Sequence, residues 1–479
     1  MWLEDFITYA LNNMTTRTTR PMTGLLMGHA VDGAHERIVW ADAHRCEHAV
    51  IIGKTGTGKT YLLEYLAWQL AQRGEGFSLF DFHGDASLSL IARLRGLPLA
   101  HQRLVILDPS HPTRSPGINV LESAPGEAAR FRKVSELSSI LRHRWGVDSF
   151  GARTEELLRN SLYTLAAANG TLADLPRLLT DALFRQRCAA GVGQSDVEAY
   201  WTDRYEPLSE AMKGAFREPL LNRVTAFLAE PAARHLLCQP QSTIDMSRTI
   251  ALRQWLIIRL PKGRLRDNAH TLGNLLFAQL QFAALAREAV PAASRYTFTL
   301  LCDEVQNLAE NDLSTLITEG RKFGVSVITA NQFWDQLSRE LRGALLSAAS
   351  HICFRVSHQD ANILSAELNP ERRSRLGVDL THLARGEAVG RFGGHKVHRF
   401  RVPSLPDTPG ISTDEFDRLV IPVTRPREEI ERDRQPASTV EPARIVRPVN
   451  DEHADGEALL PVGELTERLG DRAEGHHDW

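Results

Sequence analysis

A glycine-rich octet constrains this chain more than any other feature. Gly53-Lys54-Thr55-Gly56-Thr57-Gly58-Lys59-Thr60 matches the pattern G-x-x-x-x-G-K-[ST] at every fixed position. An apolar run at residues 48–53 leads into it, and leucines at helical spacing follow it. In such a loop successive N–H groups point inward at phosphate oxygens, and the next helix adds its positive end. The octet therefore predicts a phosphate-binding loop between a strand and a helix.

Two side chains of this loop have expected roles. Lys59 would bridge the β- and γ-phosphates of ATP, and the Thr60 hydroxyl would ligate Mg²⁺. The alternative explanation is a glycine turn that happens to contain Lys-Thr before a helix. The strand and helix expected on either side favour the ATP and Mg²⁺ site.

A second apolar run ends in two carboxylates. Phe298-Thr299-Leu300-Leu301-Cys302 is followed by Asp303 and Glu304, and paired charge at the end of a buried strand is costly without a cation. We expect Asp303 to hold Mg²⁺ through water and Glu304 to act as general base on the attacking water. Taken alone, the pair would be the start of a solvated loop, but together with the phosphate loop it indicates an ATPase.

A polar amide follows the next expected strand. The apolar run at residues 325–330 ends in Asn331 and Gln332. An amide beside the two carboxylates can contact the γ-phosphate or the attacking water, so Gln332 is a candidate catalytic sensor. The alternative is a turn residue with no catalytic role.

Short apolar runs alternate with helix-spaced stretches over most of the chain. Strand-like runs occur at residues 48–53, 77–82, 104–107, 256–260, 298–301, 325–330 and 351–356. Alternation of strands and helices argues for a parallel sheet covered on both faces. We therefore predict an α/β fold of the P-loop NTPase (RecA-like) type, with a mostly parallel sheet, an inserted all-helical domain and a disordered C-terminal tail.

The expected domain limits follow changes in this pattern. Residues 1–125 hold an N-terminal segment and the first part of the ATPase domain, residues 126–240 the helical insertion, and residues 241–424 the rest of the ATPase domain. An alternating stretch at 387–402 with two central glycines predicts a hairpin. Residues 425–479 are rich in Pro, Arg, Glu and Asp, so we expect a disordered tail with a short helix near Leu465.

Composition adds few constraints on partners. The net charge of −3 neither demands nor forbids a nucleic-acid partner. The five cysteines are scattered singly and have no zinc-binding spacing. Neither a signal peptide nor an apolar run long enough to span a bilayer is present in the sequence. We expect a soluble, cytoplasmic protein that reaches the inner membrane only peripherally, through a partner.

Several motifs, in this order, resemble the HerA/FtsK superfamily of ring motors. Besides the phosphate loop they are Asp81-Phe82-His83-Gly84-Asp85, Asp108-Pro109, Gly117-Ile118-Asn119-Val120-Leu121, Cys302-Asp303-Glu304-Val305-Gln306 and Gly320-Arg321-Lys322-Phe323-Gly324. Within the superfamily the chain looks most like the type IV secretion and conjugation coupling proteins, over about residues 25 to 405. Those proteins usually begin with membrane-spanning helices, from which this sequence departs.

The resemblance implies a hexameric, ATP-driven DNA translocase. Ring motors of this kind complete each site with an arginine from the neighbouring subunit, and Arg321 and Arg355 are the candidates here. For either one, the alternative is a solvated surface arginine. A conjugative motor would also meet relaxase or secretion-channel proteins.

Two basic clusters are candidates for DNA contact. They are Lys262-Gly263-Arg264-Leu265-Arg266 and Arg372-Arg373-Ser374-Arg375, and each is equally well explained as a charged, solvated loop. No sequence-reading module is present, so binding should be largely sequence-independent and sensitive to salt.

Two other functions remain open at this stage. A HerA-like motor that works with a nuclease in DNA repair or defence suits a chain without a membrane segment. A nucleotide-gated adaptor that recruits secretion substrates is the non-enzymatic alternative. Against the adaptor, a pure switch has no need of a general base such as Glu304.

Overall fold

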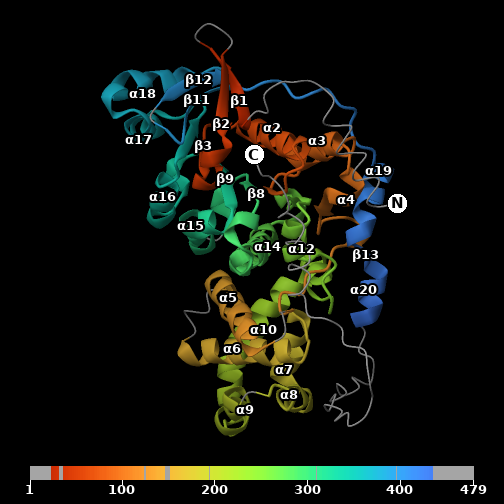
Figure 1. The fold of residues 1–479 in the computed structure, drawn as a ribbon. Coiled ribbons are helices and arrows are strands. Elements are labelled where there is room, and N and C mark those ends of the chain that lie inside the picture. The colour runs from red at the N-terminus through yellow and green to blue at the C-terminus, as the bar shows by residue number, and fades with distance from the viewer. Residues whose placement is uncertain are drawn as a thin grey trace, which may run out of the picture. The chain divides into compact units, whose positions relative to one another are not determined.

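An eleven-stranded sheet organises the described part of the chain (Figure 1). The computed structural model describes residues 23–31, 36–122, 126–145, 151–193, 195–308, 310–394 and 396–434. In spatial order the strands are β2 (Arg37–Ala41), β1 (Gly24–Ala30), β12 (Val397–Arg401), β11 (Glu387–Phe392), β10 (Ser350–Cys353), β3 (Ala49–Ile52), β9 (Val325–Asn331), β8 (Phe298–Cys302), β4 (Phe77–Asp81), β7 (Trp255–Arg259) and β5 (Leu104–Leu107).

Seven neighbouring strands of this sheet, from β10 to β5, run parallel to one another. The other four pair antiparallel at one side, and β11 and β12 form the expected hairpin. The seven strand-like runs of the sequence correspond to the seven parallel strands. The predicted mostly parallel α/β fold is therefore confirmed.

Strands β1 and β2 were not predicted, and glycine explains part of the omission. A Cβ on Gly24 would lie 2.2 Å from the Trp40 carbonyl oxygen, and one on Gly28 would lie 2.3 Å from the Arg401 carbonyl oxygen. Only glycine fits where neighbouring backbones approach this closely. The same glycines weaken the strand signal in the sequence.

Successive residues of each parallel strand point into two separate hydrophobic cores. In β3, Ala49 and Ile51 belong to one core, whereas Val50 and Ile52 belong to the other, as the period of two requires. The first core is covered by α2 (Lys59–Gln72) and α3 (Asp85–Leu94). The second is covered by α14 (Asn268–Leu285), α15 (Glu310–Glu319), α16 (Arg339–Leu346) and α17 (His358–Leu368). Burial on both faces explains why these strands read as continuous apolar runs.

A group of helices stands between β6 (Arg114–Ser115) and β7 in the chain. It comprises α5 (Glu127–Trp145), α6 (Ala152–Ala167), α7 (Leu175–Thr180), α8 (Ala182–Ala189), α9 (Ser195–Ala199), α10 (Glu210–Ala229) and α11 (Pro231–Leu237), and Figure 1 shows it in yellow and orange. Its core includes Trp201, whose indole N–H donates to the Thr164 hydroxyl at 2.8 Å. This core is continuous with the second core of the sheet. The domain limits at 126 and 240 stay a prediction.

The start of the predicted tail needs a correction. Residues 425–434 form β13 (Arg425–Pro426), which pairs with β6, and α20 (Arg427–Arg434). The Glu431 carboxylate accepts hydrogen bonds from Arg234 at 3.0 Å and from His235 at 2.7 Å, both on α11. The charged composition of residues 425–434 suggested disorder, but these residues are ordered because they pair with α11 and β6. The rest of the tail, with the helix expected near Leu465, lies outside the described residues.

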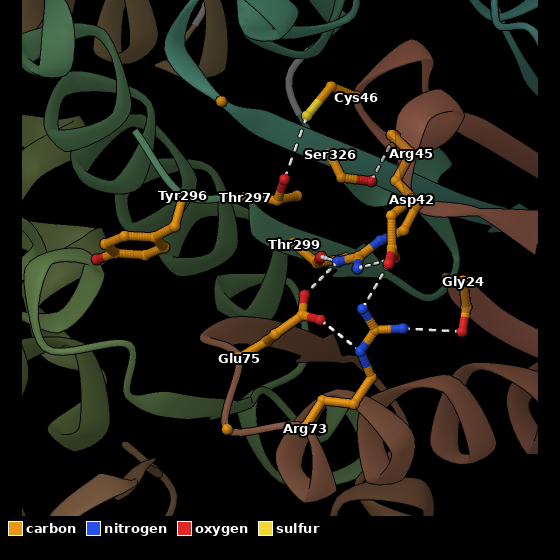
Figure 2. A network of polar contacts seen from close by, with 12 residues as sticks. Gly24, Asp42, Arg45, Cys46, Arg73, Glu75, Tyr296, Thr297, Thr299 and Ser326 are labelled. Carbon is orange, nitrogen blue, oxygen red and sulfur yellow. Dashed lines mark hydrogen bonds and ion pairs between the residues drawn. The ribbon is translucent and has the colours of Figure 1, made fainter. Parts of the chain in front are cut away.

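The amino ends of the strands are joined by an ionic network around the buried side chain of Arg45 (Figure 2). Arg45, 2% exposed, donates to Asp42 at 2.9 Å, to Glu75 at 2.6 Å and to the Thr299 hydroxyl at 3.3 Å. Arg73, at the end of α2, closes the ring with Asp42 at 2.7 Å and Glu75 at 2.6 Å. Buried Arg45 is therefore paired with two carboxylates, which is the condition under which buried charge is tolerated, whereas the Asp42 and Arg73 side chains are 37% and 29% exposed.

No helix in the described ranges is both long enough and apolar enough to cross a bilayer.

One prediction concerns His48, which lies between η1 (Asp42–Glu47) and β3. Its Nδ1 accepts the Val327 N–H at 3.1 Å, and burial lowers its pKa to about 4. Because the unfolded chain takes up this proton near pH 6.5 and the folded chain only near pH 4, stability should fall as pH falls through that window. Thermal unfolding from pH 7.5 to 4.5 should show a loss about 1 to 3 kcal/mol larger in wild type than in His48→Asn.

Asparagine is the matched substitution, since its amide oxygen can accept the same N–H bond without titrating. Equal pH dependence in the two proteins would contradict the assignment of a neutral, accepting His48.

Candidate functional site

The phosphate loop has the backbone that its sequence predicts. It leaves β3 at Ile52 and enters α2 at Lys59, with Gly56 and Gly58 at φ of 75° and 121°. The Thr57 hydroxyl donates to the Lys54 carbonyl at 2.7 Å and closes the turn. Positive φ at two positions is the conformation that glycine allows and other residues resist.

Lys59 is buried within this loop, and no carboxylate in the described part of the chain forms an ion pair with it. Its ammonium donates to the backbone carbonyls of Gly53 at 2.6 Å and Lys54 at 3.1 Å. Burial lowers the pKa of Lys59, while the nearby charges of Asp303 and Glu304 oppose that shift. A cation held only by carbonyls in a loop of inward N–H groups suits an anionic ligand such as a phosphate.

Asp303 directly follows β8 and faces the start of α2. Its Oδ2 accepts the Thr60 hydroxyl at 2.7 Å, and its Oδ1 accepts the Glu304 N–H at 3.0 Å. Burial raises the pKa of Asp303, and the bond from Thr60 only partly offsets this. A hydroxyl and a desolvated carboxylate in contact are hard oxygen ligands, so the pair fits a magnesium ion together with a phosphate.

Glu304 accepts four hydrogen bonds and has a left-handed backbone, with φ of 51°. Its Oε1 accepts from His83 at 2.7 Å and Gln332 at 3.3 Å, and its Oε2 from Lys262 at 2.9 Å and Asn307 at 3.2 Å. Burial alone would raise its pKa, but the bonds from Lys262 and His83 outweigh burial and lower it to about 2. The carboxylate is therefore ionised throughout the neutral range.

The turn that carries His83 is fixed by Asp81 at the end of β4. The Asp81 carboxylate accepts N–H bonds from His83 at 2.9 Å, Gly84 at 2.8 Å and Ser87 at 2.8 Å. These are free donors at the start of α3, so the carboxylate caps that helix. In the sequence this motif carries only a resemblance to the ring motors, and its contact with Glu304 was not predicted.

A cavity of about 280 Å³ opens where these segments meet. It is lined by Thr55, Gly56, Gly58, Lys59, Thr60, Tyr61, His83, Asp303, Glu304, Asn331, Gln332 and Arg385. The structure thus brings the phosphate loop, both carboxylates and Gln332 together around one space. Among the described residues no cluster of three or more His, Cys, Asp or Glu offers a separate metal site.

The two candidate catalytic arginines, Arg321 and Arg355, and a third arginine, Arg385, lie at three different places relative to the sheet. Arg321, in η8 (Gly320–Phe323) before β9, pairs with Glu47 at 3.0 Å and is on the opposite edge of the sheet from the cavity. Arg355 is exposed after β10, and its carbonyl accepts the Lys54 N–H at 2.8 Å. Arg385 lines the cavity itself, yet it was not predicted. Its signal would have been the Arg-Gly pair before β11, since the Gly386 N–H donates to the Thr57 carbonyl at 2.9 Å.

Comparison with solved structures gives the fold a precedent. The plasmid coupling protein TrwB, in complex with a non-hydrolysable GTP analogue, matches 84% of this chain and 94% of its own, with a TM-score of 0.59 and 17% identity. This chain has the fold of a conjugative coupling protein. Its fold also matches VirB4 of Thermoanaerobacter pseudethanolicus over 81% of this chain and 98% of that one, with a TM-score of 0.55 and 13% identity. No protein-family model and no curated protein sequence matches the chain.

A second prediction separates the two acids of the Asp-Phe-His-Gly-Asp motif. Asp81→Ala leaves three N–H groups without an acceptor, so it should lower the free energy of unfolding by about 2 kcal/mol. The matched control is Asp85→Ala, an exposed residue in the first turn of the same helix, which should cost at most about 1 kcal/mol. Denaturant unfolding measures both, and equal losses would contradict the capping role of Asp81.

Proposed function

We propose that this chain is an ATPase whose hydrolytic centre is the cavity between the phosphate loop and the end of β8. The observation that carries the proposal is the 2.7 Å contact between the Thr60 hydroxyl and the Asp303 carboxylate. This contact sets a metal-binding pair from two distant segments beside Lys59 and Glu304. TrwB, whose fold this chain shares, has been solved in complex with ADP and Mg²⁺ and with a non-hydrolysable ATP analogue.

Each side chain around the cavity has a separate proposed role in ATP hydrolysis. Loop N–H groups and Lys59 bind the phosphates of ATP, and Lys59 exchanges its carbonyl partners for phosphate oxygens. Thr60 and Asp303 would hold Mg²⁺, which neutralises phosphate charge when it is bound. Glu304 accepts a proton from the attacking water, whose oxygen bonds to the γ-phosphorus as the bond to ADP breaks. Gln332, within reach of the Glu304 carboxylate, orients that water.

We propose further that hydrolysis drives translocation of DNA through a homo-hexameric ring of the coupling-protein type. The motif order and the fold shared with TrwB support this. The same resemblance favours a cytoplasmic motor that is peripheral to the inner membrane through a partner, with relaxase and secretion-channel proteins as candidate partners. The second candidate function, a HerA-like motor that works with a nuclease, uses the same site and differs in its partners.

In such a ring, Arg321 is the proposed arginine acting in trans. The seven-residue strand β9 separates it from the cavity of its own subunit, a distance of about 20 Å at roughly 3.3 Å per residue. It is therefore too far from its own cavity to contact nucleotide in cis, and in the proposed ring it would act on the cavity of a neighbouring subunit. Arg355 and Arg385 lie at the carboxyl edge of the sheet beside their own phosphate loop, where they can contact nucleotide in cis.

The third prediction tests ATPase activity and its substrate. Steady-state ATP hydrolysis should rise on addition of DNA and rise less at high salt, because contacts to phosphates release counterions. Lys59→Ala and Glu304→Gln should each lower the rate at least about 100-fold. The control Lys396→Ala, an exposed lysine after β11, should leave the rate unchanged. Hydrolysis that ignores DNA would refute translocation of DNA and leave the ATPase intact.

A fourth prediction tests the trans arrangement. Arg321→Ala and Glu304→Gln proteins should each be nearly inactive alone, because every interface of a uniform ring lacks one required group. Mixed rings contain interfaces that combine an intact Glu304 with an intact neighbouring Arg321, so activity should partly return. Mixing without any recovery, in preparations shown to exchange subunits, would argue against Arg321 as the trans residue.

A further inference from the structure

The Glu304 carboxylate has no free acceptor position in this structure. Its two oxygens offer about four lone-pair sites, and His83, Gln332, Lys262 and Asn307 donate one hydrogen bond each. A general base must accept a proton from water on one of those oxygens at about 3 Å. At least one of the four donors must therefore leave before Glu304 can act.

Three of the donors are held close to Glu304 by their own segments. Asn307 belongs to η7 (Val305–Asn307), the turn that directly follows Glu304, and Gln332 directly follows β9. His83 stands on the turn that Asp81 fixes through three N–H bonds. The His83 side chain is 57% exposed, so its rotation alone would also free an acceptor position, on Oε1.

Lys262 is the ammonium among these four donors, the group suited to a phosphate. Its ammonium reaches Glu304 at 2.9 Å and the Asn307 side-chain oxygen at 3.0 Å from a flexible stem, and its side chain is one-third exposed. It begins α13 (Lys262–Leu265), a short turn of helix just beyond β7. Rotation of the lysine side chain alone frees one acceptor position on Oε2, while the bond from Asn307 remains.

The turn around Lys262 presents further positive charge to solvent. Arg264 and Arg266 are both exposed, and neither has a salt-bridge partner within the described ranges of the chain. Two free guanidinium groups beside a partly exposed ammonium suit a row of phosphates, such as a nucleic-acid backbone. The same turn thus joins a phosphate-binding surface to the proposed general base.

We propose that the basic turn at residues 261–267 couples DNA to hydrolysis through Lys262. A DNA phosphate binds the Lys262 ammonium, and the acceptor position that this frees on Glu304 Oε2 then takes the proton of the attacking water. Without DNA, Lys262 keeps Glu304 saturated and turnover slow. This inference rests on the proposed ATPase function and assigns Lys262 the role of a positioning residue that restrains the base.

Coupling between two sites is reciprocal. If DNA draws Lys262 from Glu304, then Glu304 competes with DNA for Lys262. Loss of the Glu304 charge should therefore tighten DNA binding even when no nucleotide is present. This gives a measurement that does not depend on turnover.

The first arm of the test compares ATP hydrolysis by wild type, Lys262→Met and the control Lys396→Ala, each with and without DNA. Lys262→Met should raise the DNA-free rate up to about tenfold, the population shift expected from losing one charge-assisted hydrogen bond. Its stimulation by DNA should shrink toward one. Binding of a fluorescent ATP analogue, unchanged in Lys262→Met, shows that this variant is folded.

The second arm measures the affinity for a DNA oligonucleotide without nucleotide in a double-mutant cycle. Glu304→Gln should tighten binding severalfold in the wild-type background and have no effect in the Lys262→Met background. Arg264→Ala should weaken binding in both backgrounds.

The two arms also separate the outcomes. A lower DNA-free rate in Lys262→Met, or DNA stimulation that survives there, overturns the coupling role while wild-type hydrolysis still supports the ATPase. An equal effect of Glu304→Gln in both backgrounds overturns it as well. Absence of any wild-type hydrolysis overturns the proposed function, and this inference with it.

Discussion

Parallel strands end at a common edge of their sheet, and this constraint decides where the side chains proposed to act within one subunit lie. In the order β3, β9, β8, β4 and β7, five adjacent strands run parallel. Their carboxyl ends lead in turn to the phosphate loop, Gln332, the carboxylates Asp303 and Glu304, His83 and Lys262. Ligand sites of open α/β sheets form at this edge because the connecting segments converge there.

The opposite edge supplies rigidity. Arg45 and Arg73 bind Asp42 and Glu75 there and tie η1, α2 and β8 together. At the carboxyl edge, by contrast, the proposed chemistry requires side chains to exchange partners. Lys59 and Lys262 both rest on groups inside the chain, and each would have to release them to meet a phosphate.

Local sequence pattern was enough to predict the parallel strands, the phosphate loop and the two carboxylates, because a contiguous stretch of residues defines each of them. What was missed depends on partners far apart in the chain. The His83 ring hydrogen-bonds to Glu304, which lies 221 residues further along the chain. Only the strand order brings the two side chains together. Arg385 reaches the cavity because its turn contacts Thr57. Lys262 was a candidate for DNA contact, and a sequence cannot show that its ammonium donates a hydrogen bond to Glu304.

The two neighbouring carboxylates have separate proposed roles: Asp303 binds the metal, and Glu304 accepts a proton from water. The most direct test of these roles is the affinity of wild type, Asp303→Asn and Glu304→Gln for a non-hydrolysable ATP analogue, with and without Mg²⁺. We expect Mg²⁺ to tighten binding of the ATP analogue in wild type and in Glu304→Gln, but not in Asp303→Asn. Tightening retained in Asp303→Asn, or lost in Glu304→Gln, would contradict these roles.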